Sequence, residues 1–280
     1  MAEFCAMKQM NKKKVALVTG ASSGIGEATA RLLAKSGYMV YGVARRIEKM
    51  KQLQSLGIHT LSMDVSVDDS ITKAIDQIIA AEGTIDVLIN NAGFGSFGAV
   101  EDVAMKDARY QLEVNVIGLA RLCQLVLPYM RKQRSGKIVN VTSIGGKMAT
   151  PLGGWYHASK FAVEGLSDSL RLEVKQFGVD VIIIEPGGVK TEWADIAMGH
   201  ANTVSGASAY KVMTEKANKI SMKQEKYSEP IEIATVIKKA IEVNKPKARY
   251  ALGHLAGVIL FAKKWLSDGL FDKMILSQIK

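Results

Sequence analysis

The sequence predicts an α/β fold, a doubly wound parallel sheet between two layers of helices, and two observations predict it. Six short runs rich in β-branched residues alternate along the chain with segments of helical period. These runs are apolar at successive positions, as is typical of strands that are buried on both faces. Strands that alternate with helices in this way form a parallel sheet covered on both sides. The chain therefore predicts a three-layer α/β/α domain.

The six predicted strands are residues 15–19, 39–44, 58–63, 86–90, 137–142 and 179–185. Between the third and the fourth strand, helical spacing is shown by Val67, Ile71, Ile75 and Ile78. This succession is a Rossmann-type fold, in which ligands bind outside the carboxyl ends of the strands. We assign residues 14–252 to this single domain and residues 253–280 to its C-terminal helical extension.

Composition places the chain among ordinary globular proteins. Its 280 residues fit one large domain, with 48% hydrophobic residues and only 5 Pro. The formal net charge of +10 raises the question of nucleic-acid binding. The basic excess is spread along the chain, however, and no basic run is interleaved with aromatic residues. We therefore expect no nucleic-acid partner.

The two cysteines and the N-terminus predict the compartment. Cys5 and Cys123 match no metal or redox spacing, and the four histidines are scattered, so we expect no metal site. Residues 1–13 are interpreted as a leader, with Met10 as the natural start, and they lack the apolar core of a signal peptide. The longest apolar run, 251–262, is shorter than the roughly 20 residues that span a bilayer. We expect a cytoplasmic protein without a membrane span.

A glycine-rich turn, "TGASSGIG" at 19–26, follows the first strand and opens a helix. Glycines permit a tight turn and a close approach of the backbone to a diphosphate, and the helix N-terminus offers free N–H groups. Many such turns use glycine for geometry alone, but this position favours dinucleotide binding. The predicted diphosphate contacts are Gly20, Ser22, Ser23, Gly24, Ile25 and Gly26.

The end of the second strand predicts which dinucleotide is bound. Sites for NAD usually have Asp or Glu there, whereas this chain has Arg45 and Arg46. Two guanidinium groups suit a 2′-phosphate, so we expect NADP(H). The alternative is a pair of surface arginines at a helix start, where the helix dipole disfavours them.

The third and fourth strands end in residues that suit the adenosine. Asp64 can accept from the adenine amino group beside the backbone of Val65, although Asp64 or Ser66 equally suits a helix cap. After the fourth strand, the small-residue loop of Asn91, Ala92 and Gly93 lets the backbone contact the ribose. Turn chemistry alone also explains Asn and Gly at these positions.

Four polar residues from three segments are expected to meet at the same edge of the sheet: Asn115, Ser143, Tyr156 and Lys160. Asn115 lies on the apolar stripe of its helix, which predicts a hydrogen-bonded amide or an ordered water, with a helix-kinking core residue as the alternative. Ser143 ends the fifth strand. Tyr156 and Lys160 are four residues apart on one helix, so their polar groups can approach each other.

These motifs in this order resemble the short-chain dehydrogenase/reductase family over residues 14–252. The resemblance rests on "TGASSGIG", "NNAG", the Asn115 helix, Ser143, "YHASK" and "PGGVKT". It implies that Ser143, Tyr156 and Lys160 are catalytic and that Asn115 joins a proton relay. It also implies that the "PG" loop contacts nicotinamide and that the chain forms homodimers or homotetramers.

Proton transfer is the chemistry that Tyr156 would perform. A free phenol has a pKa of about 10, and a neighbouring ammonium group together with oxidised nicotinamide would lower it. Tyr156 would then act as general acid or base while Ser143 donates to the substrate oxygen. Lys160 would also hold the nicotinamide ribose, and a water on Asn115 would return the proton.

The sixth strand leads into further predicted nicotinamide contacts: Pro186, Gly187, Val189 and Thr191. Residues from about 190 to 228 show weak periodicity and are interpreted as an irregular substrate lid or as a flexible surface loop. Trp193 is the predicted substrate contact, with Met198 and Met213 as further walls of the lid.

The extension at 253–280 has a helical stripe of Leu255, Ile259, Ala262, Leu266 and Leu270. It predicts, in order of preference, a helix packed on the domain or a dimer interface, a wall of the substrate pocket, or a basic helix at a membrane surface. The leading function is an NADPH-dependent reductase of a small or medium apolar carbonyl compound, or a dehydrogenase of its secondary alcohol. The alternatives are a 3-oxoacyl-carrier-protein reductase and a non-catalytic NADP-binding redox sensor.

Overall fold

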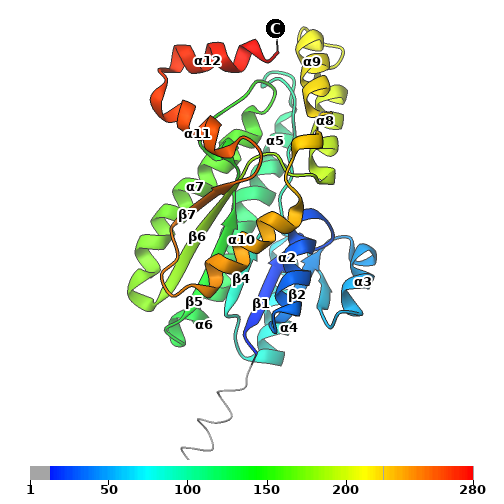
Figure 1. Ribbon diagram of the computed structural model, residues 1–280. Coiled ribbons are helices and arrows are strands. Elements are labelled where there is room, and N and C mark those ends of the chain that lie inside the picture. Colours follow the sequence, from blue (N-terminus) through cyan, green and yellow to red (C-terminus); the bar gives the residue numbers. More distant parts are fainter. Residues whose placement is uncertain (1–12, 223, 280) are drawn as a thin grey trace, which may run out of the picture.

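A computed structural model describes residues 13–222 and 224–279, and it contains one parallel sheet in the order β3-β2-β1-β4-β5-β6-β7 (Figure 1). The leader, with Cys5 and Met10, lies outside the described residues. The strands are β1 (Val15–Thr19), β2 (Met39–Ala44), β3 (His59–Ser62), β4 (Val87–Asn90), β5 (Gly136–Val141), β6 (Val179–Pro186) and β7 (Arg249–Leu252). The strand order reverses between β1 and β4, which places a crevice at their carboxyl ends.

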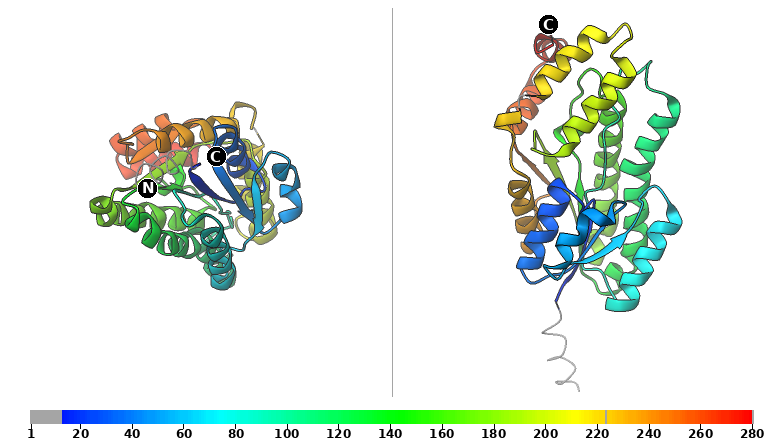
Figure 2. Two further views of the ribbon diagram at one scale, coloured as in Figure 1. Left: turned by 90° about the horizontal axis from the view of Figure 1, so that it is seen from below. Right: turned by 90° about the vertical axis from the view of Figure 1, so that its right-hand side faces the viewer.

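Helices cover both faces of the sheet, as Figure 2 shows from the side. One face is covered by α4 (Asp68–Glu82), α6 (Gly118–Lys132) and α7 (Gly154–Val174), with α5 (Met105–Leu112) packed on α7. The other face is covered by α2 (Gly24–Lys35) and α10 (Pro230–Glu242), with the short α3 (Lys51–Gln54) beside β2 and β3. Ile71, Ile75 and Ile78 of α4 are buried in the first of these two cores, as the helical spacing predicts. Val67, the fourth member of that stripe, is instead the exposed N-cap residue of α4.

The doubly wound fold predicted from the sequence is confirmed, and the six predicted strands are each found within one or two residues. The seventh strand, β7, was missed because its four residues include Arg249 and lack an apolar run. β7 pairs with β6 from Ile183 onward at the edge of the sheet. An edge strand is buried on fewer sides, so its sequence carries less of the hydrophobic signal.

The prediction of an irregular segment at 190–228 is wrong. Residues there form α8 (Glu192–Ser205) and α9 (Lys211–Ser221), which pack against each other beyond the carboxyl ends of the strands (Figure 1). The side of α8 that faces inward is made of the small residues Ala197, Ala201 and Ser205. A stripe of small residues gives little hydrophobic contrast, so helical periodicity was weak in this segment.

The two ends of this insertion are hydrogen-bonded to each other. Lys190 N–H donates to the Ser228 carbonyl over 2.9 Å, and Ser228 N–H donates to the Gly188 carbonyl over 3.1 Å. Gly187 N–H donates to the carbonyl of Leu252, the last residue of β7, over 2.8 Å. The insertion and the C-terminal extension therefore leave the sheet side by side.

The single helical stripe predicted for the extension is also corrected. Two helices, α11 (Ala256–Trp265) and α12 (Asp268–Ser277), are separated by an extended Leu266 and by Ser267, the N-cap residue of α12. Ala256 and Phe271 are the buried residues of the two helices, whereas Leu255 and Leu270 are exposed. Because the helix is broken at Leu266 and Ser267, the residues that face inward in α12 are not those expected from one continuous helix.

One helical stretch of the described residues, Met105–Lys132, is long and apolar enough to cross a membrane by length and composition. Its apolar residues Leu119, Leu122 and Val126 are buried against the sheet. Core helices of globular proteins have the same composition, so we assign this stretch to the core.

Candidate active site

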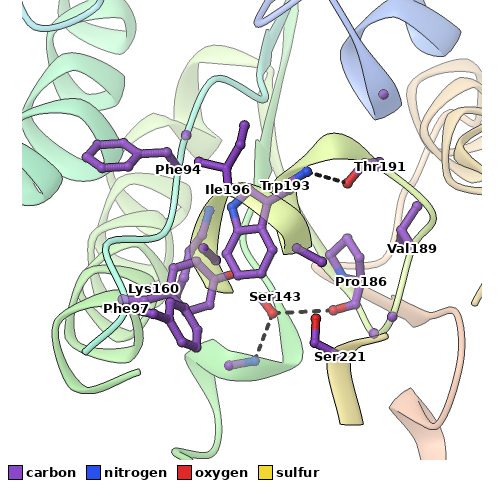
Figure 3. A pocket seen from close by; sticks show the side chains of 18 of the residues that line it. Phe94, Phe97, Ser143, Lys160, Pro186, Val189, Thr191, Trp193, Ile196 and Ser221 are labelled. Carbon is purple, nitrogen blue, oxygen red and sulfur yellow. Dashed lines mark hydrogen bonds between the residues drawn. The ribbon is translucent and has the colours of Figure 1, made fainter. Parts of the chain in front are cut away.

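A cavity of about 1550 Å³ opens at the carboxyl ends of the strands and continues between α8, α9, α11 and α12. Except for Gly26 and Asn115, all the predicted site residues line it, and so do Met198 and Met213. Figure 3 shows that Ser143, Lys160 and Trp193 from three separate segments lie around one space. The topology therefore brings together predicted site residues as far apart in the sequence as Gly20 and Trp193.

The glycine turn has the geometry that its sequence predicts. Gly20 and Gly24 adopt φ angles of +68° and +57°, a region that disfavours residues with a Cβ. Gly26 is buried below the turn, where a Cβ would overlap the Gly20 carbonyl oxygen. Its role is therefore close packing of α2 on the turn, while the exposed backbone of the turn lines the cavity.

Thr19, the residue before the turn, was not predicted as part of the site. Its hydroxyl accepts hydrogen bonds from the backbone N–H of Asn91 and of Ala92, over 3.0 and 2.9 Å. The Asn91 side chain donates to the Thr19 carbonyl over 2.9 Å. The loops after β1 and β4 are thus fixed to each other, and a hydroxyl next to a glycine turn was the signal that could have identified this link.

Both arginines after β2 line the cavity and are already hydrogen-bonded. Arg45 Nη1 donates to the Tyr110 hydroxyl over 2.6 Å. Arg46 Nη1 lies 3.2 Å from a carboxylate oxygen of Glu192, and its Nη2 lies 3.3 Å from each of the Ser22 and Ser23 hydroxyls. Positive charge is therefore held beside the glycine turn.

Asp64 uses its side chain locally. One carboxylate oxygen accepts from the Ser66 N–H over 2.9 Å and from the Ser66 hydroxyl over 2.7 Å. These bonds stabilise a local turn, and the helix-cap alternative is wrong, because the N-cap residue of α4 is Val67 and no side chain caps the helix. Asp64 and Val65 still line the cavity.

Asn115 lies in a π-helical turn, Glu113–Ile117, between α5 and α6. Its side-chain oxygen accepts from the Phe94 N–H over 3.1 Å, and its amide nitrogen donates to the Phe94 carbonyl and the Ser159 hydroxyl over 2.9 and 3.0 Å. The buried amide is therefore satisfied by protein groups and joins the loop after β4 to α7. The extra residue of the π turn is a local irregularity that hydrophobic spacing does not reveal.

Ser143, Tyr156 and Lys160 meet below the cavity. Ser143 Oγ accepts from the Gly145 N–H over 3.0 Å and is also hydrogen-bonded to Tyr156. Lys160 Nζ donates to the Val141 carbonyl over 3.0 Å and lies 5.8 Å from the centroid of the Tyr156 ring. The tyrosine and the lysine are only 8% and 7% exposed.

Burial shifts both titratable groups away from the charged state. It raises the pKa of Tyr156 to about 12, against the lowering effect of the Ser143 hydrogen bond. It lowers the pKa of Lys160 to about 8, against the raising effect of the Glu164 carboxylate. Without bound ligand the pKa of the phenol is therefore raised, because desolvation outweighs the Ser143 hydrogen bond, and the lowering expected with oxidised nicotinamide bound stays a prediction. The phenol keeps its proton.

His157 was given no catalytic role and has a positioning role in the structure. Nδ1 is hydrogen-bonded to the Gly145 carbonyl over 3.0 Å, and Nε2 accepts from the Thr150 N–H over 3.0 Å. This pattern requires a neutral ring with its proton on Nδ1, and burial lowers the pKa of His157. The loop that carries Ser143 is thereby fixed to the helix that carries Tyr156.

Two aromatic residues cover the phenol. The ring centroids of Trp193 and Phe97 lie 4.9 and 5.6 Å from that of Tyr156. Thr191 begins α8, and its hydroxyl accepts from the Trp193 N–H over 3.3 Å, which fixes the first turn of the helix (Figure 3). Phe97 was missed because a single Phe in a glycine-rich loop resembles an ordinary core anchor.

A buried charge cluster lies behind the lysine. The Glu164 carboxylate accepts from the Thr142 hydroxyl over 2.7 Å and pairs with Lys147 and Arg249 over 2.8 and 3.0 Å. Burial and the nearby Glu164 raise the pKa of Glu185. Among the described residues, no group of three or more His, Cys, Asp or Glu is placed to hold a metal ion.

Comparison with known proteins identifies the family. The family model of short chain dehydrogenases matches residues 14–198. A 3-ketodihydrosphingosine reductase from Bacteroides thetaiotaomicron is 39% identical over 264 residues, covering 92% of this chain and 95% of that protein. An NADPH-dependent 3-dehydrocapnine reductase from Ornithobacterium rhinotracheale is 32% identical, with 95% of this chain and 98% of that protein covered.

A solved structure shows the same architecture. The crystal structure of a short-chain dehydrogenase from Streptomyces avermitilis matches with a TM-score of 0.78 and 33% identity, and 95% of each chain is covered. The fold with its seven-stranded parallel sheet agrees with this match. The chain therefore belongs to the short-chain dehydrogenase/reductase family and is an oxidoreductase.

Proposed function

We propose that this protein reduces a ketone to a secondary alcohol with NADPH, and that Tyr156 donates the proton. The observation that carries the proposal is the buried phenol, hydrogen-bonded to Ser143 with Lys160 below it, at the base of a cavity that also contains the glycine turn. A phenol whose pKa is about 12 is protonated at neutral pH, which is the state that a reductase needs.

The residues at the end of β2 fit NADP(H). The chain directly after β2 has Arg45 and Arg46, and the position that is usually acidic in NAD sites has no carboxylate of its own. The relative from O. rhinotracheale is NADPH-dependent, which supports this assignment. When bound, NADPH supplies the hydride to the carbonyl carbon.

Four residues of the protein take part in this proton transfer or support it. Ser143 donates to the carbonyl oxygen and holds it beside the phenol. Tyr156 transfers its proton to that oxygen as negative charge develops there. The Lys160 ammonium group stabilises the resulting phenolate and holds the nicotinamide ribose, and Asn115 fixes the loop after β4 so that these groups keep their positions.

We further propose that the ketone carries a long aliphatic chain. The cavity exceeds the roughly 300–1,000 Å³ of a site for one ligand, so it has room for a dinucleotide and a sizeable substrate. Its outer part is lined mainly by apolar residues of α9, α11 and α12: Met213, Ala217, Ile220, Val258, Ile259, Met274, Ile275. The names of the two relatives include 3-ketodihydrosphingosine and 3-dehydrocapnine as substrates. These names support a substrate whose oxidised carbon is at position 3.

In this proposal α8 and α9 form the substrate lid, with Trp193 as the residue that contacts the ketone, and α11 and α12 form the opposite wall. The second of the three interpretations of the extension is thus favoured, because both of its helices line the cavity. Assembly into homodimers or homotetramers and a cytoplasmic location stay predictions.

Removing the hydroxyl oxygen of Tyr156 tests the mechanism. Tyr156→Phe should lower kcat at least a thousandfold on a 3-oxo substrate, because the proton donor is lost, while NADPH affinity measured by fluorescence changes less than threefold. Tyr129→Phe on α6 is the matched control and should keep full activity. Turnover by Tyr156→Phe at near the parent rate would show that another group donates the proton.

A further inference from the structure

One of the two arginines proposed to bind the 2′-phosphate, Arg46, already binds a carboxylate of the protein, and so does the nearby Lys49. Arg46 Nη1 and Lys49 Nζ lie 3.2 and 3.1 Å from the two oxygens of Glu192. Glu192 is 146 residues from Arg46 in sequence and is the first residue of α8. An anion therefore occupies the position beside the turn where the proposed phosphate would lie.

The contact is part of a packed junction between α8 and the glycine turn. Arg46 reaches the Ser22 and Ser23 hydroxyls from the same guanidinium group. A Cβ on Gly24 would lie 2.9 Å from the Thr191 side chain, so the start of α8 rests directly on the turn. Any ligand that moves Glu192 acts on the first turn of this helix.

The next residue of that turn covers the catalytic phenol. The Trp193 ring lies 4.9 Å from the Tyr156 ring and 5.7 Å from the Phe97 ring, centroid to centroid. Figure 3 shows the Trp193 side chain in the middle of the cavity, near Ser143. A ketone that is to reach Tyr156 needs this space, so Trp193 has to move before the substrate can bind.

We infer that Glu192 is an internal substitute for the 2′-phosphate and couples phosphate binding to the position of Trp193. The inference rests on the proposed function, since it requires NADPH as the cofactor. A phosphate group carries more charge than a carboxylate and matches the fork of Arg46, so it displaces Glu192 from both cations. Release of Glu192 frees the first turn of α8, and Trp193 leaves the phenol.

This coupling makes Glu192 a residue that determines cofactor specificity. NADPH must compete with Glu192 for Arg46 and Lys49, and it opens the space above Tyr156 when it succeeds. NADH has no 2′-phosphate, so it leaves the ion pairs in place and the phenol covered. Because the three side chains are about half exposed, we expect solvent to screen the pairs, and the competition to change affinity modestly.

The test uses two ligands that differ only in the 2′-phosphate, adenosine 2′,5′-bisphosphate and 5′-AMP. A Trp155→Phe/Trp265→Phe background leaves Trp193 as the only tryptophan, and unchanged NADPH affinity shows that this background is folded. We expect the bisphosphate to shift Trp193 fluorescence towards that of a more exposed indole. We expect 5′-AMP to bind without this shift.

Glu192→Gln in the same background removes the competing carboxylate and leaves Arg46 and Lys49 unchanged. The bisphosphate should bind about threefold to tenfold more tightly than to the parent, because the competing charge is gone, and 5′-AMP affinity should be unchanged. The ligand-free spectrum of Glu192→Gln should resemble that of the ligand-bound parent. Glu215→Gln on α9 is the control, because it removes one lid carboxylate outside these two ion pairs and should change neither quantity.

The outcomes distinguish this inference from the proposed function. A parent that prefers the bisphosphate, together with a Glu192→Gln variant of unchanged or weaker affinity and unchanged fluorescence, would overturn the coupling and leave the NADPH assignment intact. Equal affinity of the parent for the two ligands would instead overturn the phosphate assignment, and the coupling with it.

Discussion

The two sides of the cavity are built in contrasting ways. The nucleotide side, which we define as the loops after β1, β2 and β4, is held by hydrogen bonds between segments, such as those from Asn91 and Ala92 to Thr19. The substrate side, which we define as α8, α9, α11 and α12, has exposed apolar side chains, including Val258, Phe261 and Trp265 on one stripe of α11. The contrast suggests a fixed site for a constant cofactor and an adaptable wall for the substrate.

Glycine substitutions should give the largest difference between the two sides. Gly26→Ala places a Cβ against the Gly20 carbonyl, so we expect it to lower the free energy of unfolding by more than about 3 kcal/mol and to abolish NADPH binding. Gly199 of α8 has no heavy atom within 4 Å of its Cβ position. Gly199→Ala should therefore raise the free energy of unfolding by about 0.5–1 kcal/mol through helix propensity.

Urea unfolding of the two variants measures both effects. The contrast between the sides would break down if Gly199→Ala were as destabilising as Gly26→Ala. Equal stability of Gly26→Ala and the parent would show that the turn can relax around a Cβ.

The pH dependence of stability should reveal the buried lysine. The pKa of Lys160 in the native protein is about 8, and that of an unfolded lysine is about 10.4. Between these values the unfolded chain binds more protons than the native protein, so the free energy of unfolding rises with pH. We expect a contribution of about 2 kcal/mol between pH 8 and pH 10. Above pH 10 the raised pKa of Tyr156 opposes it, since the native phenol then holds a proton that the unfolded one releases.

The measurement compares urea unfolding at pH 8 and pH 10 for the parent, for Lys160→Met and for Lys219→Met on α9. The rise should disappear in Lys160→Met and persist in Lys219→Met, because Lys219 is exposed. If the free energy of unfolding still rises between pH 8 and pH 10 in Lys160→Met, groups other than Lys160 cause the rise.

The smallest expected effect is on chain-length preference. Ile259→Ala removes part of the apolar wall, so we expect kcat/KM for a 3-oxo substrate with a long chain to fall about tenfold, and that for a short-chain ketone to change less than twofold. Val212→Ala is the control, since Val212 is exposed on α9 outside the cavity lining. An equal loss for both chain lengths would place the alkyl chain elsewhere.

The same contrast explains what the sequence could predict. Strands buried on both faces have strong local signals, so six of the seven strands were predicted to within one or two residues. The glycine turn also has a local signal, and the residues predicted for the nucleotide side, apart from Gly26, line one cavity. The substrate side depends on tertiary contacts: α8 faces inward with Ala197 and Ala201, and the break at Leu266 changes the inward face of the extension. Pairings over long separations, such as Arg46 with Glu192, leave no local pattern at all.

The electrostatics were the least predictable part of the site. The sequence placed Tyr156 and Lys160 together correctly, but spacing on a helix contains no information about solvent. Burial moves the pKa of the phenol upward in the protein without bound ligand, whereas the ammonium group together with oxidised nicotinamide is expected to move it downward. Positioning by His157 also became visible only when Gly145 and Thr150 were found at its two ring nitrogens.

The hydrogen-bonded ends of the insertion have a consequence for how such a protein can diversify. The hydrogen bonds of Ser228 with Gly188 and Lys190 hold the two ends of the segment that contains α8 and α9 next to each other. The length of this segment can therefore change without moving the strands. Segments of this kind tolerate insertion, deletion and exchange. We therefore expect that the segment between Lys190 and Ser228 can be exchanged by recombination at two adjacent points while the sheet stays unchanged.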